Sequence, residues 1–144
     1  MKNILLDKDI IIDAYLPNRP EHAYAYTLID CLQYGEVNAH VTPLTLKDVY
    51  CILYEFVKEK ESRNSVFWIT KYMNVLCVDD FIINEAVQSN EPNFEDGIIR
   101  SCAETNNMDF IISRNEEAYK KSRVKRMSAK EFLTEIMDVQ EVEI

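Results

Sequence analysis

The chain has 144 residues, 47% of them hydrophobic and 28% charged, which is typical of one folded domain and excludes an intrinsically disordered chain. Its formal net charge of −9 argues against loose, nonspecific binding to nucleic acid. Only two glycines occur, which excludes a glycine-rich phosphate loop, and no apolar run reaches the roughly 18 residues that span a membrane.

These features predict a single domain over residues 1–144. The first residues lead directly into an apolar run and lack the features of a secretion signal, so we expect a cytoplasmic protein with no membrane partner. The four cysteines form no C-x-x-C pair, and the two histidines lack the spacing of zinc ligands. The cysteines are therefore expected to be reduced core residues.

The first half of the chain alternates short apolar runs with helical patterns. Gly35 is a suitable residue to end a helix, and the apolar positions from Val49 to Val57 recur with a period of 3.6 residues. The expected strands and helices are, in order, a strand at 3–7, helices at 8–16 and 20–34, a strand at 38–42, and helices at 45–60 and 62–73.

The second half continues the alternation. Asn93 and Ser128 are good N-caps for the helices that follow them. The expected elements are strands at 75–78, 109–113 and 124–127 and helices at 81–89, 94–106 and 128–137. Strands separated by helices predict an α/β fold of three layers, in which helices cover both faces of a short parallel sheet of four to five strands.

Three aspartates occur where a carboxylate needs an explanation. Asp7 ends the apolar run Ile4-Leu5-Leu6, which predicts a buried strand that delivers a carboxylate to its C-terminal edge, where open α/β sheets bind ligands. Asp48 and Asp96 border the apolar faces of their helices, where a lone charge is costly. If the three meet, a hard divalent cation, Mg²⁺ or Mn²⁺, would relieve their repulsion.

Each of these acids also has a local structural explanation. Asp7 can cap the next helix, and Asp48 lies in a first turn where an acid complements the helix dipole. Asp96 fits a capping-box position three residues after Asn93, and Asn115 after a strand is a common turn residue. These explanations do not predict that all four residues occur at the sheet edge or in the first helical turns of one α/β layout. We therefore expect them to form one site.

Four segments of the chain carry a resemblance to a known family. They are Ile4-Leu5-Leu6-Asp7-Lys8-Asp9-Ile10-Ile11-Ile12-Asp13-Ala14, Phe94-Glu95-Asp96-Gly97-Ile98-Ile99, Asp109-Phe110-Ile111-Ile112-Ser113-Arg114-Asn115 and Arg126-Met127-Ser128-Ala129-Lys130-Glu131-Phe132-Leu133. In this order they resemble the motifs of a PIN domain, a family of metal-dependent ribonucleases. The resemblance implies a PIN-like α/β/α fold over essentially the whole chain.

The resemblance also implies roles for individual residues. Asp7 and Asp96 would be metal ligands, Asp48 would take the place of the family's helix glutamate, and Asn115 would be the fourth polar group of the catalytic set. The chain departs from the family pattern at four positions. Asp48 is one methylene shorter than glutamate, Asp9 replaces an asparagine, Ser113 replaces a threonine, and Ala118 stands where many members have an aspartate that Glu116 would have to replace.

The activity that this resemblance implies is hydrolysis of RNA phosphodiester bonds with Mg²⁺ or Mn²⁺, with Asp96 or Asp48 orienting the water. Small bacterial members look like toxins of toxin–antitoxin pairs, which implies a homodimer and a small antitoxin partner. Residues 118–128 hold five basic side chains and no acid. The candidate substrate-binding residues are Ser113, Arg114, Lys120, Lys121 and Arg123.

Two alternatives remain open from the sequence. Asp7-Lys8-Asp9 after a strand and Asp79-Asp80 after a second strand mimic the nucleophile and metal motifs of haloacid-dehalogenase-like phosphatases. Ala118 and the short Asp48 also allow a PIN-like module with a weakened site that binds another protein and is not an enzyme.

Overall fold

A computed structural model describes residues 1–142, so that residues 143–144 of the predicted domain lie outside the described part. The five strands are β1 (Lys2–Leu6), β2 (Val37–Val41), β3 (Asn74–Val75), β4 (Phe110–Ile112) and β5 (Lys125–Met127). The helices are α1 (Lys8–Tyr15), α2 (His22–Cys31), α3 (Pro43–Tyr72), α4 (Asp80–Gln88), α5 (Phe94–Thr105) and α6 (Ala129–Glu135), with short 3₁₀ turns η1 (Leu32–Tyr34) and η2 (Glu117–Tyr119).

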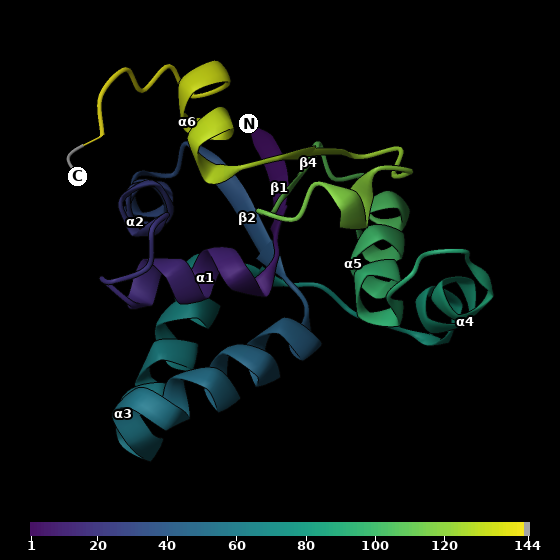
Figure 1. The fold of residues 1–144 in the computed structure, drawn as a ribbon, viewed down its shortest axis with the longest axis horizontal. Coiled ribbons are helices and arrows are strands. Elements are labelled where there is room, and N and C mark those ends of the chain that lie inside the picture. Colours follow the sequence, from purple (N-terminus) through teal and green to yellow (C-terminus); the bar gives the residue numbers. More distant parts are fainter. Residues whose placement is uncertain (143–144) are drawn as a thin grey trace.

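The strands form one parallel sheet in the order β3-β2-β1-β4-β5, which confirms the predicted α/β class and strand number. β1 lies at the centre, and α1, α2, α3 and α6 lie on one side of the sheet while α4 and α5 lie on the other (Figure 1). This is the three-layer arrangement that the alternating sequence pattern predicted.

Alternation along β1 supplies both layers of the core. Ile4 and Leu6 pack into the cluster formed with α1, α2, α3 and α6, whereas Leu5 packs with α4 and α5. All three side chains are fully buried. A continuous apolar run is therefore what a strand covered on both faces requires, because successive side chains point to opposite faces.

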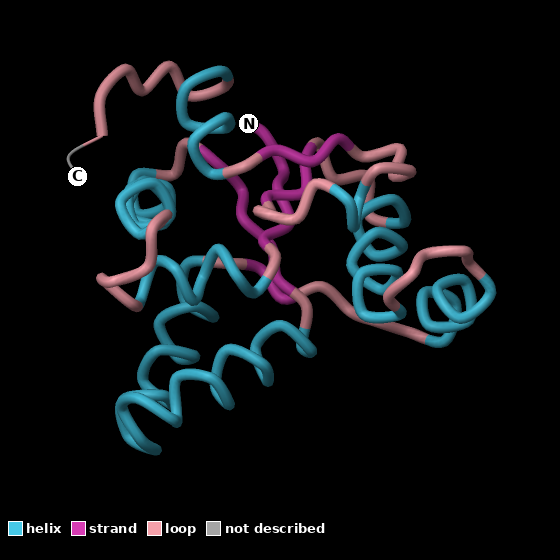
Figure 2. The backbone as a smooth tube through the Cα atoms, viewed as in Figure 1, coloured by secondary structure: helices cyan, strands magenta, loops and turns pink. Residues whose placement is uncertain are grey.

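The longest helix differs from its prediction. The helices expected at 45–60 and 62–73 are joined in α3, and the break lies at Lys58, whose φ of 64° and ψ of −169° are not helical. The tube in Figure 2 folds back on itself within the helical segment that Figure 1 labels α3, so α3 consists of two limbs. Ser62, the expected start of the second helix, is a buried residue within that limb. Within residues 1–142 no helix combines the length and hydrophobicity needed to cross a bilayer.

Three residues that were predicted to end or start helices do so in the structure. Gly35 follows η1 with φ 71°, a left-handed conformation that glycine adopts at little cost. The Asn93 side chain accepts a hydrogen bond from the Asp96 amide and starts α5, and Ser128 forms a capping box with Glu131 at α6. Asn93 thereby fixes where the first turn of α5, which carries Asp96, begins.

Candidate metal centre

Asp7 lies directly after β1, at the C-terminal edge of the sheet. Its amide donates to the carbonyl of Ile112 at 3.0 Å, which continues the pairing of β1 with β4 by one residue. Its carboxylate caps α1 by accepting from the Lys8 amide at 2.8 Å, so the local capping role considered for Asp7 is present. The capping role uses Oδ1 only, because Oδ2 has other partners.

Two hydroxyl groups hold the second oxygen of Asp7. Ser113 Oγ donates to Oδ2 at 2.9 Å and Tyr119 Oη donates at 2.8 Å. Burial, and after it the charge of Asp7, raise the pKa of Tyr119 far above its ordinary value, so this hydroxyl stays protonated as a donor at neutral pH. Ser113 was predicted to bind substrate; in the structure it is buried and orients Asp7.

The structure brings Asp7, Asp48 and Asp96 to one pocket of about 420 Å³. Asp48 comes from the first limb of α3 and Asp96 from the first turn of α5, and both are half-buried. Lys8 and Glu95 also line this pocket, which we call the acidic pocket. Three points of the chain that are far apart in sequence thus meet beside the end of β1.

The electrostatics of the acidic pocket reflect this proximity. Burial, followed by the charge of Asp7, raises the pKa of Asp96 above its ordinary value. The Lys8 ammonium lies 3.6 Å from Asp48 Oδ2 and 3.4 Å from Glu95 Oε2. Four acidic side chains thus face two lysines among the lining residues, and the excess of negative charge favours a cation.

The donor set fits a hard divalent cation, since it consists of carboxylate oxygens without cysteine or histidine. Within residues 1–142, no three acidic, histidine or cysteine side chains converge closely enough to enclose an ion as they stand. The Lys8 ammonium contacts the carboxylate of Asp48 on one side and that of Glu95 on the other. The space between these two carboxylates therefore suits a positive charge. Asp7, Asp48 and Asp96 are the residues that would hold Mg²⁺ or Mn²⁺.

Asn115, the fourth predicted catalytic residue, does not line the acidic pocket. Its side-chain oxygen accepts from the Ala118 amide at 3.1 Å in the turn that leads into η2, while its own amide donates to Ser113 Oγ. It lies in a different hollow with Arg114 and Glu116. Glu116 itself pairs with Arg126 at 3.3 Å, so it does not supply a carboxylate next to Asp7 in place of an acid at position 118.

Arg114, a predicted substrate-binding residue, is engaged within the protein. Its Nε lies 2.7 Å from Oδ2 of Asp13, a buried residue, and its amide donates to Asp9. Burial and the neighbouring charge of Asp7 raise the pKa of Asp9 to about 6 despite the opposing charge of Arg114. Arg114 therefore neutralises a buried carboxylate at this edge of the sheet, although part of its side chain stays exposed.

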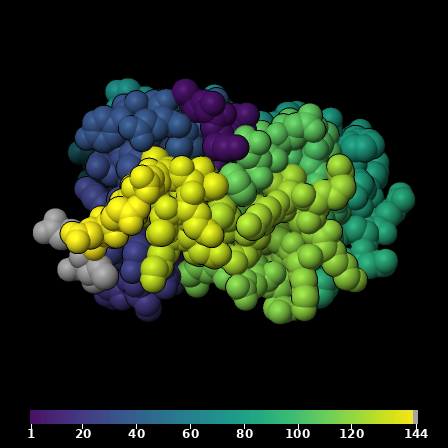
Figure 3. Space-filling view, turned by 90° about the horizontal axis from the view of Figure 1, so that it is seen from above, coloured from purple at the N-terminus to yellow at the C-terminus, as the bar shows by residue number. Residues whose placement is uncertain are grey.

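The remaining predicted substrate-binding residues lie outside the acidic pocket. Lys120, Lys121 and Arg123 are exposed, in the chain between η2 and β5. Lys120 pairs loosely with Glu117 at 4.0 Å and Arg123 with Glu104 at 3.6 Å. The C-terminal part of the chain, green to yellow in Figure 3, forms much of the face seen from above. These side chains are thus accessible to a large ligand.

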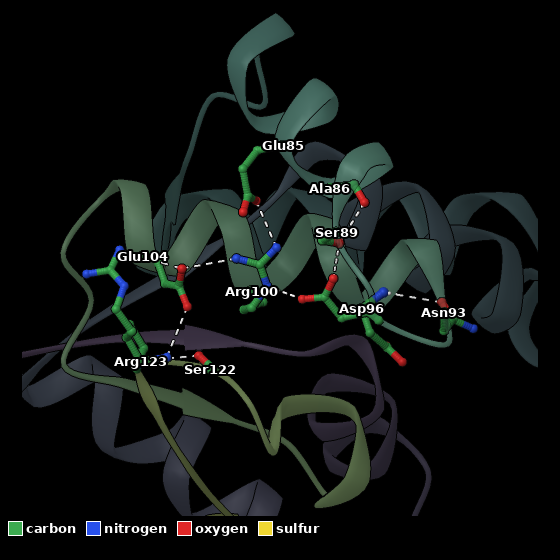
Figure 4. Close-up of polar contacts among 11 residues, drawn as sticks. Glu85, Ala86, Ser89, Asn93, Asp96, Arg100, Glu104, Ser122 and Arg123 are labelled. Atoms are coloured by element: carbon green, nitrogen blue, oxygen red, sulfur yellow. Dashed lines mark hydrogen bonds and ion pairs between the residues drawn. The ribbon is translucent and has the colours of Figure 1, made fainter.

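An ion-pair cluster around the buried Arg100 connects α5 with α4 and with the loop between them. Arg100 lies on α5, and its guanidinium contacts Glu85 at 2.8 Å and Glu104 at 3.0 Å (Figure 4). It also contacts Glu91. Only 8% of the Arg100 side chain is exposed. Ser89 donates to Glu91 within the loop between α4 and α5, and the contact of Glu91 with Arg100 holds this loop against α5. We call Arg100 and the three glutamates the arginine cluster.

Sequence reasoning missed two close neighbours of this centre. Tyr119 lies 112 positions from Asp7, and the pairing of β4 with β1 brings it near. Lys8 adjoins Asp7, but a lysine in the first turn of a helix is unfavourable with respect to the helix dipole, and that placement was an available signal. Asp79 and Asp80, the basis of the phosphatase alternative, start α4 and do not line the acidic pocket.

Comparison with known proteins agrees with this architecture. The chain is similar to VapC20 of Mycobacterium tuberculosis, described as a sarcin-ricin loop cleaving toxin, with 11% identity over 81% of this chain and 93% of that chain and a TM-score of 0.65. A toxin-antitoxin complex from Klebsiella pneumoniae matches with 18% identity, 88% and 97% coverage and a TM-score of 0.65. PAE2754 from Pyrobaculum aerophilum matches with 14% identity, 96% and 97% coverage and a TM-score of 0.66.

No curated protein sequence matches the chain. At identities this low the solved structures establish the fold and no activity. The family model described as "PIN domain" matches residues 3–117, which include Asp7, Asp48, Asp96 and Asn115. With most of its length matched, the chain belongs to the PIN domain family.

Proposed function

We propose that this protein is a Mg²⁺- or Mn²⁺-dependent endoribonuclease and the toxin of a toxin–antitoxin pair. The observation that carries the proposal is the meeting of Asp7, Asp48 and Asp96 in one pocket at the C-terminal edge of the sheet. Family membership and structural neighbours that are described as toxins support it.

Each residue of the site has a definite part in this proposal. When bound, the divalent ion supplies a Lewis acid that polarises the scissile phosphate and lowers the pKa of a water. Asp7 binds the ion through a carboxylate that Ser113 and Tyr119 hold in a fixed orientation. We assign the proton-accepting role to Asp96 instead of Asp48, because both oxygens of Asp48 already pair with lysines.

The direct test is the variant Asp7→Asn. An asparagine side chain still caps α1 but lacks the charge that binds the cation, so Mn²⁺-dependent cleavage of RNA should fall by about 10³-fold or more. The matched control is Asp109→Asn, the same change just before β4, where the aspartate accepts from the Asn3 amide. Retained cleavage in Asp7→Asn, with the fold intact by circular dichroism, would defeat the proposal.

We further propose that Lys120, Lys121 and Arg123 contact the RNA backbone outside the pocket. All three are exposed, and residues 118–128 contain no acid that would repel a phosphate. Replacing all three by glutamine should reduce the slope of log Kd against log salt concentration by the amount that corresponds to the loss of up to about three phosphate contacts. An unchanged slope would show that these side chains do not touch phosphate.

The partners and location follow the same proposal. Two of the reported neighbours are named as a toxin and as a toxin-antitoxin complex, which supports a small antitoxin partner for this protein. We also propose that the protein is a homodimer and is located in the cytoplasm. Light scattering should then give twice the chain mass of 16.9 kDa. A small DNA-binding protein encoded next to this gene, once co-expressed, should co-purify with the chain and suppress its cleavage of RNA.

A second candidate is a PIN-like module that binds protein and has lost catalysis. The pairing of Asp48 with Lys8 and the hydrogen bond from the Ala118 amide to the Asn115 side chain favour it, because both engage predicted catalytic groups within the protein. Calorimetry with Mn²⁺ separates the two candidates. A folded protein that binds no Mn²⁺ at millimolar concentration supports the module, and binding that Asp7→Asn abolishes supports the nuclease.

A further inference from the structure

Lys8 occupies a position where a cation has an electrostatic cost. It is the first residue of α1, and the positive end of a helix dipole disfavours an ammonium group there. Its side chain is 40% exposed and is free to extend into water. It instead lines the acidic pocket, so its contacts there must more than offset that cost.

The contacts of Lys8 connect three elements at the pocket. From α1 its ammonium reaches Asp48 on α3 at 3.6 Å and Glu95 on α5 at 3.4 Å. Burial alone would lower the pKa of Lys8, but the charges of Glu95 and Asp48, with a smaller contribution from Asp7, raise it above its ordinary value. The ammonium thus responds to acids on both helices and to the carboxylate that precedes it.

The other lysine of the pocket is placed differently. Lys47 lies next to Asp48 in the sequence and pairs with its Oδ1 at 3.4 Å, and 71% of its side chain is exposed. It contacts no acid of a second element among the ion pairs of residues 1–142. Lys47 therefore screens Asp48 from outside, whereas Lys8 lies between carboxylates of two helices.

We propose that the Lys8 ammonium is the built-in counter-ion of the acidic pocket, which a divalent cation has to displace from Asp48 in order to bind. The inference rests on the proposed metal site. Asp48 cannot give the same oxygen to an ammonium and to a metal ion, so the two cations compete. Lys8 then weakens metal binding and holds the carboxylates of α3 and α5 together while no metal is present.

The experiment measures Mn²⁺ binding by calorimetry in the whole chain with Lys8→Met, Lys8→Arg and the wild type. Removing the competing ammonium should tighten the Mn²⁺ Kd about tenfold in Lys8→Met, whereas Lys8→Arg should stay near the wild-type value. Lys71→Met makes the same charge change on the surface at the end of α3 and should alter the Kd less than about twofold. In EDTA, Lys8→Met should melt about 2 °C lower, a loss that Mn²⁺ reverses.

The outcomes separate this inference from the proposed function. If the wild type binds Mn²⁺ and Lys8→Met binds it equally or more weakly, the inference is overturned and the metal site stands. If only Lys8→Met binds, the ammonium excludes the ion altogether and the inference holds in its strongest form. If neither variant binds, both proposals fail. Tightening in Lys71→Met equal to that in Lys8→Met would assign the effect to net charge and also overturn the inference.

Discussion

Two groups of acidic side chains lie at α5, and they are compensated in different ways. In the arginine cluster, three glutamates surround one buried guanidinium. In the acidic pocket, three aspartates and Glu95 have as their innermost cation Lys8, which is partly exposed and contacts its partners at 3.4 Å or more. The first group is an internally paired structural element, and the second keeps negative charge available for a ligand.

The geometry of the cations explains the difference. A guanidinium presents five donors in a plane and can satisfy several carboxylates at once, whereas an ammonium is a point charge on a flexible stem. Arg100 therefore fixes α4, the following loop and α5 relative to one another. Lys8 is able to leave its partners at little cost, because exposed ion pairs contribute little stability.

The largest effect should come from removing the guanidinium. Arg100→Met leaves Glu91, which is 11% exposed, without its cation and removes the nearer of the two cations of Glu104, so it should lower the free energy of unfolding by about 3 kcal/mol. Arg63→Met is the matched control, because Arg63 pairs with Glu59 on the surface of α3 and is itself exposed. It should cost no more than about 0.5 kcal/mol. Urea titrations that give equal losses would remove the distinction between buried and exposed pairs.

The pH dependence of that loss sharpens the comparison. Burial alone would raise the pKa of Glu91, but hydrogen bonds from Ser89 and Arg100 hold it below the ordinary 4.5. A carboxyl group whose pKa is lowered by folding stabilises the protein fully at pH values above its pKa in the unfolded chain. This stabilisation is lost as the pH falls through its pKa in the folded protein. The difference between wild type and Arg100→Met should therefore be complete at neutral pH and shrink below about pH 5. A difference that stays constant into strong acid would contradict the role of charge.

The smallest effects should have opposite signs in the two groups. Glu104→Gln removes a charge that Arg100 and Arg123 use, and should destabilise the protein by about 1 kcal/mol. Asp96→Asn removes a charge that burial and Asp7 disfavour and, because solvent screens this half-exposed group, should stabilise the protein in EDTA by only about 0.5 kcal/mol. Chemical denaturation of both variants checks this. Changes of the same sign in the free energy of unfolding would mean that the carboxylates of the acidic pocket do not repel one another enough to destabilise the fold.

Strand ends and helix starts are the part of the site that the sequence predicted. Asp7 was located because an apolar strand delivers its last residue to the sheet edge, and Asp96 because it borders the apolar face of the helix that Asn93 starts. The boundary between the two helices that are joined in α3 was predicted too late, between residues 60 and 62, since the break at Lys58 has no glycine or proline to mark it. The contacts of Tyr119 and Lys8 depend on tertiary proximity, which local patterns do not contain.

Diffraction from crystals of the wild-type protein soaked in Mn²⁺ would test the central claim most directly, because anomalous scattering locates the ion. We expect a peak in the acidic pocket, within about 2.5 Å of an oxygen of Asp7 and of an oxygen of Asp48 or Asp96. A peak that lies only outside this pocket, or no peak at saturating Mn²⁺ with the three side chains well ordered, would contradict it.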